Sequence, residues 1–202
     1  NISFFGLRNS QTLEKELTAT VNDFCKSAGD LSDTKTGALV VFEKDAPLQE
    51  IIKTGTILDA QSSPELFNGL FFKNSALHDG AVVVRDGRIY AAGCILPLTQ
   101  NNSLDSELGT RHRAAIGMSE HSDAVVVIVS EETGIISISI NGELERGFTY
   151  TTLRTRLEEI LNPIKDSGNK KKKKRKKKNK NGVNAVAKAD TTANKGDNAD
   201  NA

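Results

Sequence analysis

The chain has 202 residues and is 37% hydrophobic, which is enough to fill one core but would be crowded for two domains. Its formal net charge of +1 hides an asymmetry, because residues 170–202 carry 12 Lys and Arg against 3 Asp and Glu. Residues 1–169 carry 15 against 23, a net charge of −8. A positive overall surface is therefore excluded as the means by which the globular part binds a polyanion, which would need a local site or a metal.

Two further classes are excluded by the cysteines and the hydropathy. Cys25 and Cys94 are far apart and lack CxxC spacing, so we expect reduced thiols and neither a disulfide framework nor a thiolate metal site. No stretch reaches the roughly 18 consecutive apolar residues of a membrane-spanning helix, and none has the layout of a secretory signal. Because the chain begins with the apolar letters NISFF, we interpret residues 1–9 as the membrane-proximal stub of a longer protein.

The first half of the chain predicts a helix, a strand and a second helix. Apolar residues at helical spacing predict an amphipathic helix over residues 10–28, which Gly29 ends. The run TGALVVFEK predicts a buried strand over 36–44. Residues 48–60 are expected to be a short irregular stretch, and a helix follows near 63–72, with Ser63 as its cap and Pro64 at its first position.

The second half predicts two hairpins and two helices. Strands over 77–84 and 88–98 are joined by the strong turn signal Asp86-Gly87. A helix over 109–121 comes next, and residues 123–142 read as two strands joined at Thr133-Gly134, before a last helix over 153–161. Because strands and helices are mixed without strict alternation, we expect an α/β (α+β) fold: a single globular domain over 10–165 with a mixed central β-sheet flanked by helices.

Residues 166–202 have a different character. They include KKKKKRKKKNK at 170–180, ten basic residues in eleven, followed by Asn, Ala, Asp and Lys without periodicity. Such a segment cannot bury a core, so we predict a disordered Lys-rich tail.

Three polar clusters interrupt the apolar elements. The first opens a strand, the second opens a helix and the third ends a strand: His78-Asp79-Gly80, Gly109-Thr110-Arg111-His112-Arg113 and Ser130-Glu131-Glu132. Each has an ordinary structural interpretation by itself, as a turn, a solvated helix start or a loop. Strand ends and helix starts are also where α/β sites are assembled, so together the clusters predict one site.

The helix start suits an anion. Its backbone N–H groups and positive dipole end attract negative charge, Thr110 adds a hydroxyl donor, and Arg111 and Arg113 add charges that suit phosphate. Consecutive helical residues point about 100° apart. Arg111, His112 and Arg113 therefore cannot all touch one phosphate, and at least one of them is expected to serve a structural or cross-subunit role.

The other two clusters suggest a divalent metal. We expect Asp79 to be a buried carboxylate at the mouth of a buried strand, which is costly unless something compensates it. His78, Asp79 and Glu132 are groups that bind Mg²⁺ or Mn²⁺, with the imidazole favouring Mn²⁺. Strand alternation would place Ser130 and Glu132 on one face and leave Glu131 in solvent.

Taken in order, LHDGAVVV, ILPL, ELGTRHRAAIG and VSEETG resemble the diadenylate cyclase (DAC) domain family, from about Leu13 to Leu161. The pair of motifs that marks the family is intact, as Asp-Gly-Ala at 79–81 and Arg-His-Arg at 111–113. The short ending and single helix before the first strand resemble the membrane-tethered branch, here as its soluble catalytic domain.

The resemblance implies a nucleotidyltransferase that condenses two ATP into cyclic di-AMP and releases two pyrophosphates. It works as a face-to-face homodimer in which each 3′-hydroxyl attacks the α-phosphate held by the partner, and it needs a divalent metal, Mg, Mn or Co. The implied catalytic residues are Asp79, Arg111, His112 and Arg113. The implied metal ligands are His78, Asp79 and Glu132. The implied nucleotide-binding residues are Gly80 and Ala81 near the ribose, the Leu96 backbone at the adenine edge, Thr110 and Arg111 near phosphate, and Ser130 near the polyphosphate.

One position departs from the family pattern, since many relatives carry Tyr where this chain has Ile95. An aromatic ring would stack on adenine for about 1–3 kcal/mol, so the affinity for the base is expected to be weaker or supplied by another residue.

The resemblance also implies a location at the cytoplasmic face of the cell membrane, with Lys170–Lys180 either an anchor to anionic lipid or an inert tail. The alternative functions are a catalytically silent adenine-nucleotide sensor, and a nucleic-acid-binding protein acting through the tail. We expect no specific nucleic acid partner, because the acidic globular part offers no other basic patch.

Overall fold

The structure is a computed structural model that describes residues 10–101 and 108–161. Helices and strands follow one another along this part of the chain in the order α1 (Ser10–Asp33), β1 (Ala38–Phe42), α2 (Gln49–Ile52), β2 (Thr56–Ala60), α3 (Pro64–Phe71), β3 (Ala81–Arg85), β4 (Arg88–Cys94), α4 (Thr110–Glu120), β5 (Val125–Val129), β6 (Ile136–Ile140), β7 (Glu143–Phe148) and α5 (Tyr150–Leu161). The predicted tail and stub lie outside the described residues.

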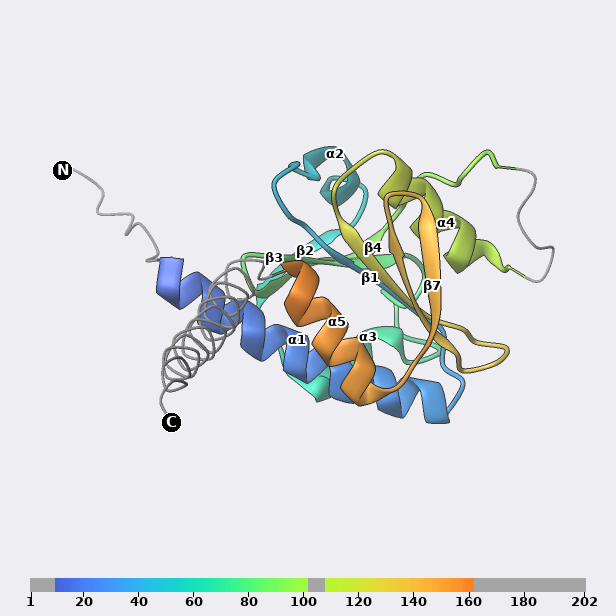
Figure 1. Ribbon diagram of the computed structural model, residues 1–202, viewed down its shortest axis with the longest axis horizontal. Helices are drawn as coiled ribbons and strands as arrows, with labels where there is room; N and C mark the ends of the chain where they lie inside the picture. The colour runs from blue at the N-terminus through green and yellow to red at the C-terminus, as the bar shows by residue number, and fades with distance from the viewer. Residues whose placement is uncertain (1–9, 102–107, 162–202) are drawn as a thin grey trace, which may run out of the picture. The chain divides into compact units, whose positions relative to one another are not determined.

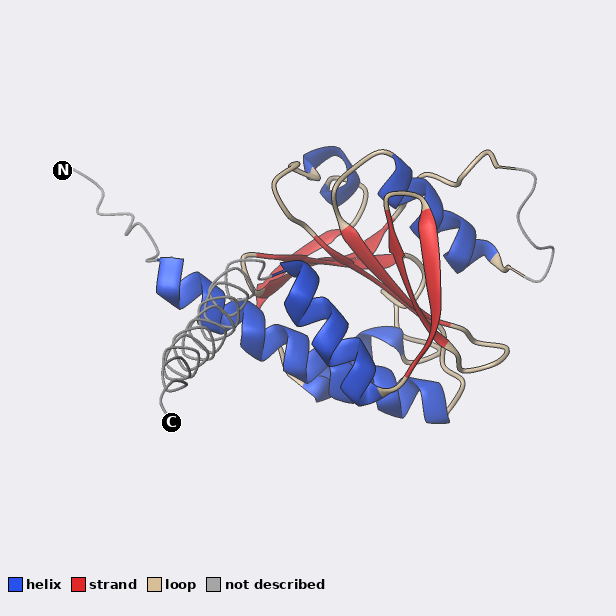
Figure 2. Cartoon of the chain, viewed as in Figure 1, coloured by secondary structure: helices blue, strands red, loops and turns tan. Residues whose placement is uncertain are grey.

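The seven strands of the described residues, drawn red in Figure 2, form one sheet. Their order is β2-β4-β3-β1-β5-β6-β7. The β1–β3 pair is parallel, and the other pairs are antiparallel. The predicted hairpins are confirmed, since β3 pairs with β4 and β5 pairs with β6. The fold is therefore the predicted α+β arrangement with a mixed central sheet.

Helices cover both faces of the sheet. In Figure 1, α1, α3 and α5 lie on one side of it, and α2 and α4 lie on the other. Residues alternate between the faces along each central strand, as in β1, where Val40 and Phe42 join the core under α1 and Val41 joins the core under α4. On the α1 side, Phe24 packs its ring against Phe42 and Phe67.

Several elements differ from the predictions. Helix α1 continues through Gly29 to Asp33 because Leu31 is buried in the core, and this packing outweighs the helix cost of a glycine. Helix α5 begins at Tyr150, earlier than predicted.

The predicted irregular stretch contains α2 and the edge strand β2, which pairs with β4. Strand β7, the sequence ELERGF, was not predicted because this exposed edge strand lacks a regular apolar alternation. Within the described ranges, no helix has the length and apolar character needed to cross a membrane.

Candidate active site

The first turn of α4 and the loop after β5 enclose a small cavity of about 60 Å³, called here the helix-start pocket. It is lined by Gly109, Thr110, Arg111, His112, Val129, Ser130, Glu131 and Glu132. Thr110 and Arg111 have backbone N–H groups without an acceptor in the described part of the chain, whereas those of His112 and Arg113 donate to the Gly109 carbonyl. The pocket thus combines unpaired N–H groups with the positive end of a helix dipole, which favours an anion.

The loop after β5 is a tight turn and does not extend the strand. The Ser130 hydroxyl accepts from the Glu132 and Thr133 N–H groups at 3.3 and 3.2 Å, and the Gly134 N–H donates to the Ser130 carbonyl at 2.9 Å. Ser32, in α1, donates its hydroxyl to the Gly134 carbonyl at 2.6 Å and ties the loop to the helix. The strand alternation predicted for Ser130–Glu132 is therefore wrong, since these residues lie in a turn.

Arg111 is held between this loop and the segment after α1. Its Nη1 donates to Glu131 Oε2 at 2.6 Å, so Glu131 is an ion-pair partner and is not simply solvated as predicted, although its side chain is 62% exposed. A Cβ at Gly37 would lie 2.7 Å from Arg111 Nη1 and 3.0 Å from Glu131 Cβ. Gly37 is therefore required for the guanidinium to lie where it does.

A larger cavity of about 370 Å³, called here the basic pocket, lies next to the helix-start pocket and shares Arg111 and Glu131 with it. It is lined by Thr34, Lys35, Thr36, Gly37, Phe71, Lys73, His78, Arg111 and Glu131. Two lysines, one arginine and one carboxylate line this pocket, in a domain whose sequence is acidic overall. The positive charge of this pocket is therefore local, as expected for a polyanion site in a globular part with a net negative charge.

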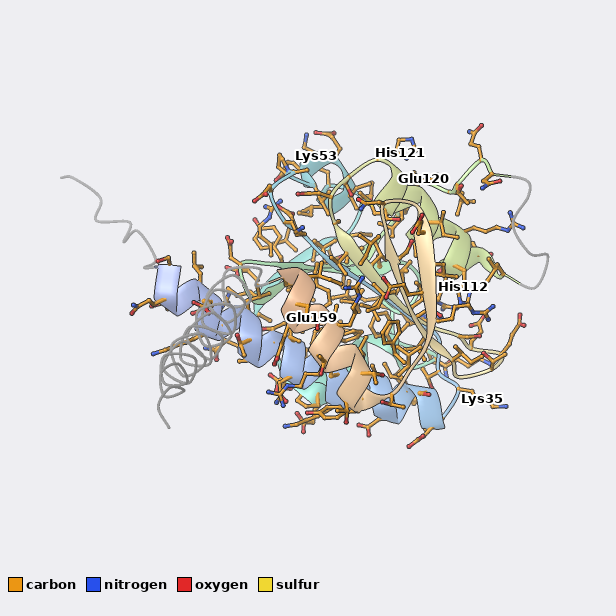
Figure 3. The ribbon with its side chains drawn as sticks, in the orientation of Figure 1. Lys35, Lys53, His112, Glu120, His121 and Glu159 are labelled. Carbon is orange, nitrogen blue, oxygen red and sulfur yellow. The ribbon has the colours of Figure 1, made fainter. Side chains whose placement is uncertain are left out.

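The surroundings of His112 and Arg113 differ from those of Arg111. His112 is 5% exposed, and its Nε2 is buried without a hydrogen-bond partner in the described residues. Burial, and next the Arg146 guanidinium, lower the pKa of the His112 imidazole below its usual value, while Glu132 acts in the opposite direction. Figure 3 shows His112 beside β7, and Arg113 donates from Nε to the Leu108 carbonyl at 3.3 Å. Arg113 lines neither pocket.

The expectation that Asp79 is buried is wrong. Asp79 is exposed on a bend before β3, so its carboxylate bears little desolvation cost. Gly80 has a φ of +115°, and a Cβ there would lie 2.7 Å from the Gly93 carbonyl carbon and 2.9 Å from the Cys94 carbonyl oxygen. Gly80 therefore lets the chain pass against β4 in a conformation that other residues rarely adopt, and Ala81 is buried as the first residue of β3.

The segment with the predicted adenine contact runs along α4. Leu96 is buried, whereas Ile95 is 68% exposed and donates its N–H to the Thr54 hydroxyl at 2.8 Å. A Cβ at Gly117 would contact the Pro97 carbonyl oxygen and would lie 2.5 Å from the Thr99 nitrogen. Gly117 thus allows the segment after β4 to cross α4 closely, and Thr99 donates its N–H to the Arg113 carbonyl at 3.1 Å.

The three predicted metal ligands do not gather in one chain. His78 lines the basic pocket, Glu132 lines the helix-start pocket, and Asp79 lines neither. Across residues 10–101 and 108–161, no group of three or more His, Cys, Asp or Glu is placed to hold a metal ion. The side chains of a single described chain do not fit a metal site, and the metal ligands stay a prediction.

The structure thus brings together part of the predicted site. Thr110, Arg111, His112, Ser130 and Glu132 line one pocket, and His78 lines the adjoining one. Asp79, Gly80, Ala81, Leu96 and Arg113 lie outside both linings. Sequence reasoning missed Glu131, Gly37 and Lys35 as parts of the site. The run KTGALVVFE contains two of them, but no motif in the sequence alone connects that run with Arg111.

Comparison with known families decides the assignment. The family model DAC, described as the nucleotide-binding domain of the DisA bacterial checkpoint controller, matches residues 25–144. The chain belongs to the DAC family. The predicted resemblance is confirmed, and the DAC domain contains both pockets together with the Asp79 bend.

Relatives of this DAC domain have names that agree with the family. Cyclic di-AMP synthase CdaA of Bacillus subtilis is 40% identical over 154 residues, 76% of this chain and 56% of that protein. Diadenylate cyclase CdaS of Bacillus thuringiensis is 51% identical over 114 residues, 56% of this chain and 57% of that protein. The chain therefore spans little more than half the length of these two relatives.

Two solved structures share the DAC fold. A double mutant of DacA from Staphylococcus aureus superposes with a TM-score of 0.70 at 40% identity, covering 73% of this chain and 99% of that one. A hypothetical membrane spanning protein from Bacillus cereus gives a TM-score of 0.62 at 45% identity, covering 64% and 63%. The central sheet and its flanking helices therefore match the structure of DacA.

Proposed function

We propose that the chain is a diadenylate cyclase, which condenses two ATP into cyclic di-AMP and releases two diphosphates. The observation that carries this proposal is the helix-start pocket, in which the unpaired N–H groups of Thr110 and Arg111 and the Arg111 guanidinium converge. These groups suit a nucleotide phosphate, and they lie in a chain of the DAC family whose relatives are named cyclic di-AMP synthase and diadenylate cyclase.

Arg111 changes partner when ATP binds. In the structure its guanidinium pairs with the exposed Glu131 carboxylate. A triphosphate carries more negative charge than one carboxylate and presents it to the same guanidinium, so it displaces Glu131. The exposed pair is weak, at about 0–1 kcal/mol, and its exchange costs little. Arg111 then stabilises the negative charge that grows on the α-phosphate during attack.

Two chains are needed for a cyclic product. Each chain has one Asp79 and one Arg111, and Asp79 is exposed, where it can face a second subunit. The Asp79 carboxylate lies beside the ribose and takes the proton of the 3′-hydroxyl. The 3′-oxygen bonds to the α-phosphorus held by the partner, and the bond from that phosphorus to the bridging oxygen breaks, its electron pair leaving with diphosphate. The return attack closes the ring.

Metal dependence is a second part of the proposal. Among the described residues, no group of three or more His, Cys, Asp or Glu is placed to hold an ion. The divalent ion, Mg²⁺, Mn²⁺ or Co²⁺, is tested directly, by omitting it and by adding a chelator.

The test of the function is product analysis. The chain is incubated with ATP and each metal in turn, and the nucleotides are separated by chromatography. We expect cyclic di-AMP and diphosphate from the wild type and almost none from Asp79→Asn, with the same circular dichroism spectrum. ATP binding without any dinucleotide product would contradict the cyclase and favour a silent nucleotide sensor.

A mixture of wild-type and Asp79→Asn chains tests the dimer. In mixed pairs one attack proceeds and the return attack fails, so linear triphosphate-ApA accumulates beyond the amount that either homodimer makes. Specific activity that stays constant under conditions shown to be monomeric, with no linear product in mixtures, would contradict the two-subunit mechanism.

We also propose that the chain acts at the cytoplasmic face of the membrane, and that Lys170–Lys180 binds anionic lipid. Support comes from the lysine run and from the Bacillus cereus relative described as membrane spanning. A chain ending at Ser167 should keep its rate in solution and lose its binding to anionic vesicles at low salt. Equal vesicle binding with and without the tail would contradict the anchor.

A further inference from the structure

Lys35 occupies a backbone position that normally belongs to glycine. Helix α1 ends in a Schellman motif, in which the Thr36 N–H donates to the Leu31 carbonyl at 2.8 Å and the Lys35 N–H donates to the Ser32 carbonyl at 3.1 Å. In this motif the first residue after the helix cap adopts the left-handed conformation. That residue is Lys35, with a φ of 50°. Glycine, or sometimes asparagine, is the usual residue there because a Cβ is strained in this conformation.

Helix electrostatics alone do not account for this lysine. A cation beyond a helix C-terminus gains some energy from the dipole, but the left-handed conformation costs a residue with a Cβ more than an exposed charge gains. Asp33 lies nearby in sequence, yet the Lys35 ammonium makes no hydrogen bond or ion pair with any residue in the described part of the chain. Backbone strain that benefits nothing within the fold is a mark of functional positions.

The strained residue faces the basic pocket. Lys35 lines that cavity together with Lys73 and Arg111, and Lys73 is likewise without an ion-pair partner among the described residues. Figure 3 shows Lys35 at the end of α1, on the side of the fold where the loop after β5 projects. Several arginines elsewhere in the described chain are paired, for example Arg85 with Glu43 and Arg156 with Glu145. Two lysines without an ion-pair partner among the described residues, Lys35 and Lys73, thus line one cavity of an acidic domain.

The relative positions of the two pockets suit a chain of phosphates. The helix-start pocket is small, the basic pocket is larger, and Arg111 and Glu131 lie on the boundary between them. If the α-phosphate lies at the start of α4, a chain of two more phosphates extends past Arg111 into the cavity that Lys35 lines.

We propose that Lys35 is a specificity-determining residue that binds the terminal phosphates of the nucleotide, and then the diphosphate that leaves. A lysine at this position, where glycine is usual, adds the charge of its ammonium to the basic pocket. This inference rests on the proposed function, since it assigns the second and third phosphates of the same substrate. It predicts that the site distinguishes a nucleoside triphosphate from a monophosphate through Lys35.

The decisive variant is Lys35→Gly, which removes the ammonium and relieves the strain together. Affinities for ATP, inorganic diphosphate and AMP are measured by calorimetry, and stability is measured by urea unfolding. We expect affinity for ATP and diphosphate to fall about ten-fold or more, as for a lost charge-assisted hydrogen bond, with AMP affinity unchanged. The midpoint of unfolding should stay the same or rise, which a structural role of Lys35 would not produce.

Two further variants control this result. Lys53→Ala removes another exposed ammonium, on the α2 side of the fold, and should leave all three affinities unchanged. Lys35→Arg keeps the charge at the same position and should keep ATP affinity within about three-fold. Unchanged affinity for ATP and diphosphate in Lys35→Gly, an equal loss for AMP, or an equal loss in Lys35→Arg would each overturn the proposal.

The same samples separate this inference from the proposed function when product is measured in parallel. If Lys35→Gly weakens diphosphate binding but the wild type makes no dinucleotide, the cyclase proposal fails and the Lys35 site stands. If the wild type makes cyclic di-AMP and Lys35→Gly binds as tightly as the wild type, the cyclase stands and the Lys35 site is wrong. Wild type that binds neither ATP nor diphosphate would overturn both.

Discussion

Helices α3 and α4 begin in opposite ways. At the start of α3, the Ser63 hydroxyl accepts the Leu66 N–H at 3.1 Å, Pro64 fills the first position, and Glu65 complements the helix dipole. Helix α4 begins at Gly109, which makes no side-chain cap, and its first turn has no acidic residue. It carries Arg111 instead, a cation where the dipole disfavours one.

The difference separates a helix start built for stability from one built for a ligand. The first turn of α4 has neither a side-chain cap nor an acidic residue. Thr110 and Arg111, whose N–H groups have no acceptor among the described residues, line the helix-start pocket. At α3 the same groups are already satisfied. A phosphate can therefore be bound at α4 and would have little to gain at α3.

The largest effect is expected for Arg111→Ala. It should lower cyclic di-AMP formation about 100-fold or more, because a charge that stabilises the transition state is lost. Stability should change by less than about 1 kcal/mol, since the variant loses an exposed ion pair and an unfavourable helix-start charge. Rate assays and urea unfolding measure the two. A variant with a much lower free energy of unfolding and an unchanged rate would show that the start of α4 serves stability and not the ligand.

Ser63→Ala should show the opposite pattern. The loss of the α3 cap should cost about 1 kcal/mol of the free energy of unfolding, with product formation per folded molecule unchanged. Urea unfolding and an assay at 25 °C measure the two. A reduced rate with unaltered stability would show that α3 serves the site, against the comparison.

His112 should make α4 sensitive to acid. Its pKa is lowered in the fold, so the unfolded chain takes up a proton near the usual value of 6.5, whereas the folded chain does so only at lower pH. The free energy of unfolding is therefore unaffected by His112 above that pH and falls as the pH drops below it, toward the folded pKa. Between pH 7 and 5, the free energy of unfolding should fall more steeply with decreasing pH for the wild type than for His112→Gln. The same pH dependence of the free energy of unfolding in both proteins would exclude this contribution.

The smallest effect on stability is expected for Glu131→Gln. The carboxylate that it removes is 62% exposed, so the stability should change by less than about 1 kcal/mol. ATP should bind at least as tightly as to the wild type, because the competing partner of Arg111 is gone. Calorimetric titration checks this, and a large loss of affinity would mean that Glu131 holds Arg111 in its binding position.

Much of the fold could be predicted from sequence because the central strands are apolar runs and the hairpin at Asp86-Gly87 is a local signal. Strand β7 could not be predicted, since its extended conformation depends on pairing with β6 at an exposed edge. At the site, a pocket at the start of α4 that favours an anion could be predicted from the residue types in one turn. The ion pair of Arg111 with Glu131 and the packing of Gly37 did not, because they join segments that are distant in sequence.

Lys35 shows the same limit. Its left-handed conformation depends on where α1 ends, and the sequence predicted that end at Gly29, several residues too early. Because Leu31 is buried, α1 extends beyond Gly29. The left-handed position of its Schellman motif is therefore occupied by Lys35 and not by a glycine. Exposure of Asp79 was missed for a related reason, since β3 begins only at Ala81.

The most direct test of the contrast between the two helix starts is the affinity for ATP of three proteins, measured by calorimetry before any turnover: the wild type, Arg111→Ala and Ser63→Ala. The wild type and Ser63→Ala should bind ATP equally, and Arg111→Ala should bind it about ten-fold more weakly or worse. Equal affinity in all three proteins would contradict the assignment of the phosphate site to the start of α4.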